Sequence, residues 1–150
     1  QKTVLPENIH SIYVDTVKNQ IDPRDLYAYV PGLEIKIADA ITDRLERDGN
    51  LKVTSKEKAD AILEAKLVRF DQEGVRFSSL EDVEEYRLFV TISMQLVNRA
   101  TGQIIWQEPN FNGDSEYFVS QVRSLSREQA ADRAIQNLAY NVVDRIVEDW

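Results

Sequence analysis

The regular alternation of apolar and polar residues between Glu85 and Leu96 is the feature that most constrains the fold of this chain. The apolar positions on one side of an extended backbone are Tyr86, Leu88, Val90, Ile92, Met94 and Leu96. The other side carries Glu85, Arg87, Thr91, Ser93 and Gln95, with Phe89 as an apolar exception. Because successive side chains of a strand point to opposite faces, the pattern predicts a long antiparallel strand with one buried and one solvated face.

Two further segments predict neighbouring strands. In "ADAILEAKLVRF" the inner face is expected to carry Ala61, Leu63, Ala65 and Leu67, and the other face Ile62, Glu64, Lys66, Val68 and Phe70. After the long strand, Gly102 suits a left-handed turn, and Ile104 and Trp106 alternate into the second strand of a hairpin. We expect Trp106 to be mostly buried. The segment "FNGDSEYF" is a candidate extension of the sheet.

Two amphipathic helices flank these strands in the sequence. The stripe of the first consists of Leu33, Ile37, Ile41 and Leu45. Pro31 and Gly49 mark its start and its end. The stripe of the second consists of Ala131, Ala134, Ile135, Leu138, Ala139, Val142 and Ile146, with Trp150 as a candidate last member.

The start of the second helix is predicted by local signals. Ser126 and Gln129 have the spacing of a capping box, and Leu125 and Ala130 are available as a hydrophobic staple. A helix of ~24 residues would be about 35 Å long and would span the sheet.

The order of these elements predicts the architecture. "IHSIYVDTV" suits a first strand, residues 18–31 suit a loop, and Leu51 and Val53 begin a short strand before the long ones. The order is therefore β-α-β-β-β-β-α, an α+β two-layer sandwich with both helices on one face of a mainly antiparallel sheet. With 150 residues, 43% of them apolar, we expect a single domain over residues 1–150.

Composition argues against several classes of function. The absence of Cys and the single His exclude thiol nucleophiles and Cys-based metal sites, and we expect His10 to be an ordinary surface residue. A net charge of -8 argues against nucleic-acid binding. Glu81, Asp82, Glu84 and Glu85 are better explained as a solvated connection between two strands than as a calcium site. We expect neither a cofactor nor a metal, and no enzymatic site can be assembled.

Arg76 in "GVRFSS" and Arg123 in "SQVRSLS" are predicted to lie on loops, close to the aromatic residues Phe77 and Phe118. An arginine beside an apolar surface suits a phosphorylated amphiphile, because guanidinium binds phosphate in a bidentate manner. The residues alone favour ordinary solvated loop arginines. Tyr27, Tyr29, Trp106 and Trp150 could form a recognition surface, although tryptophans at such positions more often belong to the core.

From Leu5 to Trp150 the order of blocks resembles the LptE family, lipoproteins of the lipopolysaccharide-assembly machinery of the outer membrane. The blocks that carry the resemblance are "LPENIHSIYV", "PGLEIKIADAITDRL", "ADAILEAKLVRF", "EEYRLFVTISMQLVNRATGQIIW" and "EQAADRAIQNLAYNVVDRIVEDW". The resemblance implies a non-enzymatic accessory protein at the periplasmic face of the outer membrane. Its partners would be the LptD-type β-barrel and lipopolysaccharide.

The resemblance also implies where lipopolysaccharide binds. By position, the basic residues concerned are Arg76, before the "EYR" strand, and Arg123, before the last helix, with Arg69 as a weaker neighbour. The family's lipid-bearing Cys is absent here, and we expect it upstream of Gln1. A net charge of -8 suggests that the barrel contact is the larger role. The same loose pattern occurs in other periplasmic interaction domains, namely the TolB N-terminal domain, CsgG and LpoB, so a module of another envelope complex is the alternative.

Overall fold

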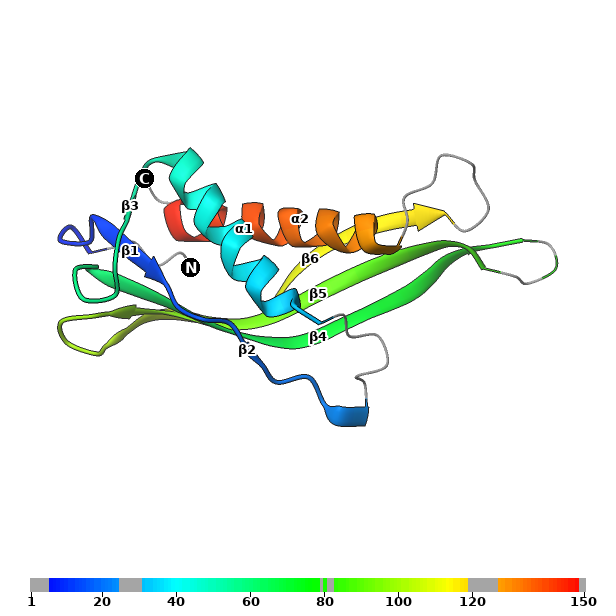
Figure 1. The fold of residues 1–150 in the computed structure, drawn as a ribbon, viewed down its shortest axis with the longest axis horizontal. Coiled ribbons are helices and arrows are strands. Elements are labelled where there is room, and N and C mark those ends of the chain that lie inside the picture. Colours follow the sequence, from blue (N-terminus) through cyan, green and yellow to red (C-terminus); the bar gives the residue numbers. More distant parts are fainter. Residues whose placement is uncertain (1–5, 25–30, 79, 81–82, 119–126, 149–150) are drawn as a thin grey trace.

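The structure is a computed structural model that describes residues 6–24, 31–78, 80, 83–118 and 127–148. Its elements follow the predicted order, with one additional short strand (Figure 1). They are β1 (Ser11–Val14), β2 (Lys18–Asn19), α1 (Leu33–Asp48), β3 (Lys52–Val53), β4 (Ala61–Phe77), β5 (Val83–Asn98), β6 (Ile104–Phe118) and α2 (Arg127–Val147).

The strands form one mixed sheet in the order β3-β1-β4-β5-β6. β4, β5 and β6 are antiparallel, whereas β1 lies parallel to both β3 and β4. Both helices lie on the same side of this sheet (Figure 1), which confirms the predicted α+β sandwich. The loop predicted for residues 18–31 was partly wrong, because Lys18–Asn19 forms β2, which pairs with β4 in parallel. Gln20 directly follows β2, and its N–H donates to the Leu67 carbonyl of β4 at 2.7 Å.

The boundaries of α1 agree with the local sequence signals. The helix begins after Gly32, whose φ is 90°, and ends at Gly49, whose φ is 78°. The Gly49 N–H donates to the Leu45 carbonyl at 3.1 Å and so satisfies a helix-terminal acceptor. All four residues of the predicted stripe are buried.

α2 also buries the stripe that its sequence predicts. The residues concerned are Ala131, Ala134, Ile135, Leu138, Ala139, Val142 and Ile146, and Ala130 and Val143 are buried with them. The predicted capping box and staple involve Ser126 and Leu125, and these lie outside the described residues, as does Trp150. Trp106 is 6% exposed, as expected, and the Arg145 guanidinium lies 4.3 Å from its ring centroid.

A bulge in β4 changes which side chains enter the core. Leu67 pairs with Ile92 and Arg69 pairs with Thr91, so Val68 is an extra residue on the β4 side. Alternation is therefore shifted by one position beyond the bulge. Phe70, predicted to share a face with Glu64 and Lys66, is instead buried among the core residues at 2% exposure.

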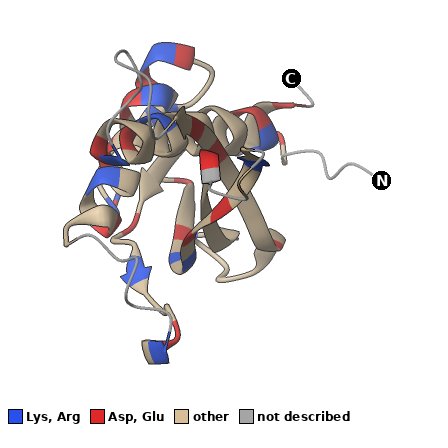
Figure 2. Ribbon diagram, turned by 90° about the vertical axis from the view of Figure 1, so that its right-hand side faces the viewer, with Lys and Arg blue, Asp and Glu red and all other residues tan. Residues whose placement is uncertain are grey.

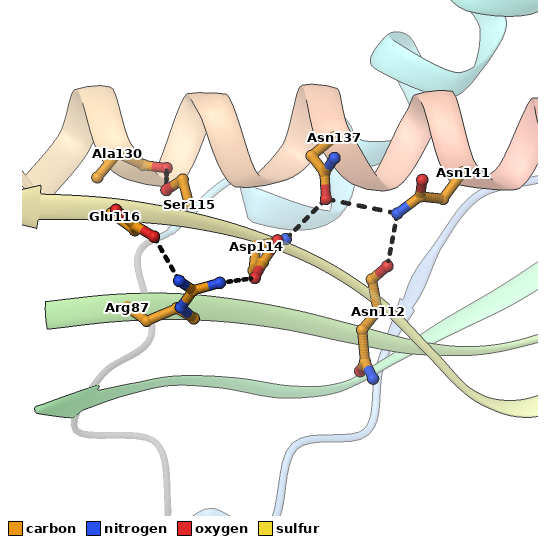
Figure 3. A network of polar contacts seen from close by, with 8 residues as sticks. All are labelled: Arg87, Asn112, Asp114, Ser115, Glu116, Ala130, Asn137 and Asn141. Carbon is orange, nitrogen blue, oxygen red and sulfur yellow. Dashed lines mark hydrogen bonds and ion pairs between the residues drawn. The ribbon is translucent and has the colours of Figure 1, made fainter. Parts of the chain in front are cut away.

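α2 approaches β6 so closely that a side chain at one position is excluded. A Cβ atom on Gly113 would lie 2.4 Å from the Leu138 backbone nitrogen and 2.5 Å from the Ala134 carbonyl oxygen. Asn137 Oδ1 accepts a hydrogen bond from the Asp114 N–H at 3.0 Å, and Asn141 Nδ2 donates to the Asn112 carbonyl at 3.1 Å (Figure 3). Two side-chain amides thus satisfy backbone groups that an edge strand leaves unpaired.

Candidate ligand-binding site at the distal sheet

The far ends of the three long strands form what we call the distal sheet, residues 69–77 of β4, 84–91 of β5 and 112–118 of β6. There β4 and β5 extend beyond the first turn of α2 (Figure 1). Arg69 and Arg76 both lie in β4, with side chains 65% and 58% exposed. The loop predicted for Arg76 was wrong, because β4 continues through Gly74 to Phe77. Arg123 lies outside the described residues.

The Arg76 side chain contacts residues of both β5 and β6. Its register partner on β5 is Glu85, whose own partner on β6 is Phe118. Arg76 Nε lies 3.3 Å from Glu85 Oε2, and the guanidinium carbon lies 5.5 Å from the centroid of the Phe118 ring. An exposed cation is thus oriented over an aromatic ring, a geometry that stabilises the cation and fixes its position.

Glu85 is a buried carboxyl group between charged neighbours. Only 8% of the residue is exposed, so placing it in a solvated connection was wrong. A hydrogen bond with Glu116 and burial raise the pKa of Glu85 above its ordinary value, and these effects outweigh the opposing influence of Arg76 and Arg87. Arg87 in turn donates to Asp114 at 2.8 Å and to Glu116 (Figure 3), and the hydrogen bond to Asp114 raises its pKa.

Arg69 does not join Arg76 in a single site. Its Nη2 lies 2.6 Å from Asp71 Oδ2, the side chain two residues along the same strand. At about 3.3 Å per residue, the seven-residue separation along β4 places Arg69 and Arg76 roughly 20 Å apart. The structure therefore supports Arg76 as the centre of a candidate site and leaves Arg69 outside it.

Aromatic and apolar side chains accompany Arg76 in the distal sheet. On the opposite, helix-side face, Tyr86 and Tyr117 stack at 5.4 Å, and the Tyr117 hydroxyl donates to Gln72 Oε1 at 2.8 Å. Burial raises the pKa of Tyr117, so this hydroxyl keeps its proton near neutral pH. Sequence reasoning did not single out this pair, although both residues follow the strand alternation. Phe77 and Leu80 are 56% and 81% exposed.

The combination of an exposed arginine with exposed apolar side chains suits an amphiphile with an anionic head group. Other chemistry finds no support in the part of the chain that the structure describes. There, no group of three His, Asp or Glu side chains could hold a metal ion. His10 is exposed, as expected, and is engaged through its backbone N–H, which donates to Asp60 Oδ2 at 2.9 Å.

Charge is distributed without a dominant sign on the helices. Figure 2 shows basic and acidic residues interspersed along them. The positive potential that attracts an anion is therefore local to individual side chains such as Arg76. Neither described helix has the length and apolar content required to cross a membrane.

The chain matches one known protein family over nearly its whole length. The sequence profile of the LptE family, described as lipopolysaccharide-assembly, matches residues 9–149. The chain belongs to the LptE family. It is therefore a member of a family of non-enzymatic lipoproteins of lipopolysaccharide assembly at the outer membrane. No curated protein matches the chain.

Solved structures with the same fold come from several bacterial proteins. Protein XCC0632 from Xanthomonas campestris has a TM-score of 0.62 and 12% identity, with 97% of this LptE-family chain and 88% of that chain covered. The PelC dodecamer from Paraburkholderia phytofirmans has a TM-score of 0.56 and 12% identity, covering 97% and 94%. Lipoprotein GNA1162 from Neisseria meningitidis has a TM-score of 0.51 and 14% identity, covering 93% and 99%. At these identities the likeness shows the fold alone.

Proposed function

We propose that this LptE-family chain, as a single domain over residues 1–150, binds an LptD-type β-barrel at the periplasmic face of the outer membrane and contacts lipopolysaccharide through its distal sheet. A lipidated Cys upstream of Gln1 would attach it to the membrane. The observation that carries the lipid contact is the exposed Arg76 guanidinium over Phe118, with Phe77 and Leu80 exposed on the same hairpin. A guanidinium can bind a phosphate of the lipid while apolar side chains meet its acyl chains.

The ion pair with Glu85 limits how strongly Arg76 can bind. A phosphate must share the guanidinium with Glu85 or displace it, and the guanidinium is reachable from solution because the Arg76 side chain is 58% exposed, whereas that of Glu85 is 10% exposed. A dianionic phosphate can therefore compete with Glu85 for the guanidinium. Arg123 is proposed to contribute to the same contact, whereas Arg69 pairs with Asp71 and lies too far along β4 to share it.

The barrel contact is tested by purifying the full-length, natively anchored protein from its own outer membrane and identifying what accompanies it by mass spectrometry. We expect an LptD-type barrel in stoichiometric amount. Recovery of a cell-wall synthase or another export complex in its place would assign the chain to a different envelope machine.

The lipid contact is tested with the double variant R76A/R123A. We expect its affinity for purified lipopolysaccharide to fall by roughly tenfold or more, since two charge-assisted contacts are lost, while the melting temperature changes little. A matched control is R47A/K52A, which removes the same charge from two exposed positions, in the last turn of α1 and in β3, and should bind like the wild type. Equal binding by R76A/R123A and the wild type would refute the assignment of Arg76.

A further inference from the structure

The face of the sheet opposite the helices contains a groove of about 430 Å³ that is separate from the distal sheet. It is lined by β2, the middle of β4 and β5, and the region around Pro109 in β6. Its polar side chains include Lys18, Glu64, Lys66, Ser93, Gln95 and Gln107. Most of its lining residues are polar or charged, unlike those at the hairpin tip, where Phe77 and Leu80 are exposed.

Two lysines lie directly opposite one another in this groove. In the parallel pairing of β2 with β4, Lys18 is the register partner of Lys66. Registered residues of neighbouring strands point to the same face, and the strands are about 4.8 Å apart. Both side chains are exposed, and neither has an ion-pair or hydrogen-bond partner among the described residues. Like charges placed opposite each other destabilise a sheet unless a counter-charge joins them.

Two of the three carboxylates that line the groove are paired with basic side chains other than the two lysines, and the third is hydrogen-bonded to a neutral amide. Glu64 Oε1 accepts a hydrogen bond from Gln95 Nε2 at 2.7 Å. Asp15 and Glu108 also line the groove, and they are paired with Lys56 at 3.4 Å and Arg145 at 3.7 Å respectively. Glu64 keeps its negative charge, because the Gln95 amide is neutral, and it offsets one of the two ammonium charges. The second ammonium charge is left to attract an anion from solution.

We propose that Lys18 and Lys66 bind a phosphate group carried by a hydroxyl-rich molecule such as a saccharide. Two ammonium groups on one face provide the charge and up to six N–H donors for the phosphate oxygens. Ser93, the register partner of Lys66 on β5, adds a hydroxyl, and Gln107 on β6 adds an amide. The polar groove next to the lysines can pair with the hydroxyl groups of the carrier.

This site is independent of the proposed lipid contact at Arg76. The phosphate could come from a soluble sugar phosphate or from the head group of a lipid, and the chemistry at the lysines is the same. The variant R76A leaves Lys18 and Lys66 intact, so failure of the lipid contact at the distal sheet and failure of the lysine site are distinguishable.

The binding test compares the wild type with K18Q/K66Q by calorimetric or NMR titration with inorganic phosphate, glucose 6-phosphate, glucose and purified lipopolysaccharide. We expect phosphate-bearing probes to bind the wild type and to lose at least tenfold in affinity in K18Q/K66Q, while glucose does not bind. The matched control K52Q/K58Q removes the same charge from two exposed lysines outside the groove and should bind like the wild type. Binding of glucose 6-phosphate would indicate a soluble ligand, and binding of lipopolysaccharide alone would indicate a lipid head group; both support the site.

Thermal unfolding gives a second readout that does not depend on knowing the ligand. Because the variant loses the repulsion between two lysines, K18Q/K66Q should melt no lower than the wild type in chloride. Replacing chloride by phosphate at equal ionic strength should raise the melting temperature of the wild type but not that of the variant. The proposal is wrong if phosphate stabilises both proteins equally, if K52Q/K58Q loses binding to the same extent, or if the wild type binds no phosphate-bearing probe at millimolar concentration.

Discussion

The absence of a Cβ atom at Gly113 allows α2 to pack closely against β6. The position of that Cβ atom is occupied by backbone atoms of Leu138 and Ala134, neither of which can rotate away as a flexible side chain would. An alanine there must therefore push α2 away from β6. That displacement would also lengthen the hydrogen bonds of Asn137 and Asn141 to the edge strand (Figure 3).

We therefore predict that G113A lowers the free energy of unfolding by about 3 kcal/mol, the upper range for overpacking. The comparison variant is G102A, which places alanine at a φ of 76° with nothing within 4 Å of the new Cβ atom. It should lose about 1 kcal/mol from backbone strain alone. Urea denaturation measures both, and an equal loss in the two variants would mean that the helix accommodates the new methyl group.

At the scale of elements, local signals were enough to predict some features but not others. The start and the end of α1 were predictable because their signals are local in the sequence. Pro31 and Gly49 flank the helix, and the four-residue spacing lies within it. Phe70 was assigned to the wrong face because the bulge at Val68 depends on how β4 pairs with β5. The Lys18–Lys66 pair was missed for the same reason, since it joins strands 48 residues apart in the sequence.

The pairing of β5 with β6 also leads to a pH prediction, because it brings Glu85 close to Glu116. The folded-state pKa of Glu85 is raised, so the folded protein binds a proton more tightly than the unfolded chain does. The contribution of Glu85 to stability should therefore fall as the pH rises from its unfolded pKa, about 4.3, through the raised folded pKa. E85Q removes this titration and should be more stable than the wild type at neutral pH.

Melting temperatures of the wild type and E85Q between pH 4 and 8 test this expectation. The difference between the two proteins should be small at the acidic end, where Glu85 is protonated, and should grow towards neutral pH. E116Q is a useful companion, because it removes the other carboxylate of the pair and should reduce the same pH dependence. A difference that does not vary with pH would mean that Glu85 titrates normally.

At the scale of the whole molecule, stability should decrease from the helix-covered part of the sheet towards the distal sheet. The core cluster contains residues of both helices and of β4 and β5 as far as Phe70 and Leu88. Beyond it, Val75, Arg76 and Phe77 are exposed, and β4 and β5 continue past α2 (Figure 1). Segments with few buried apolar contacts open at a lower free energy than the core does.

Native-state hydrogen exchange followed by mass spectrometry should reveal this gradient. We predict that amides of residues 71–77 exchange at least ~10-fold faster than those of residues 61–67 on the same strand, a difference of about 1.4 kcal/mol in opening free energy. Lipopolysaccharide should then slow exchange in residues 71–77 selectively, because binding at Arg76 orders that end of the hairpin. Uniform protection along β4 would show that the distal sheet is as rigid as the core, and the lipid would then meet a site that is already formed.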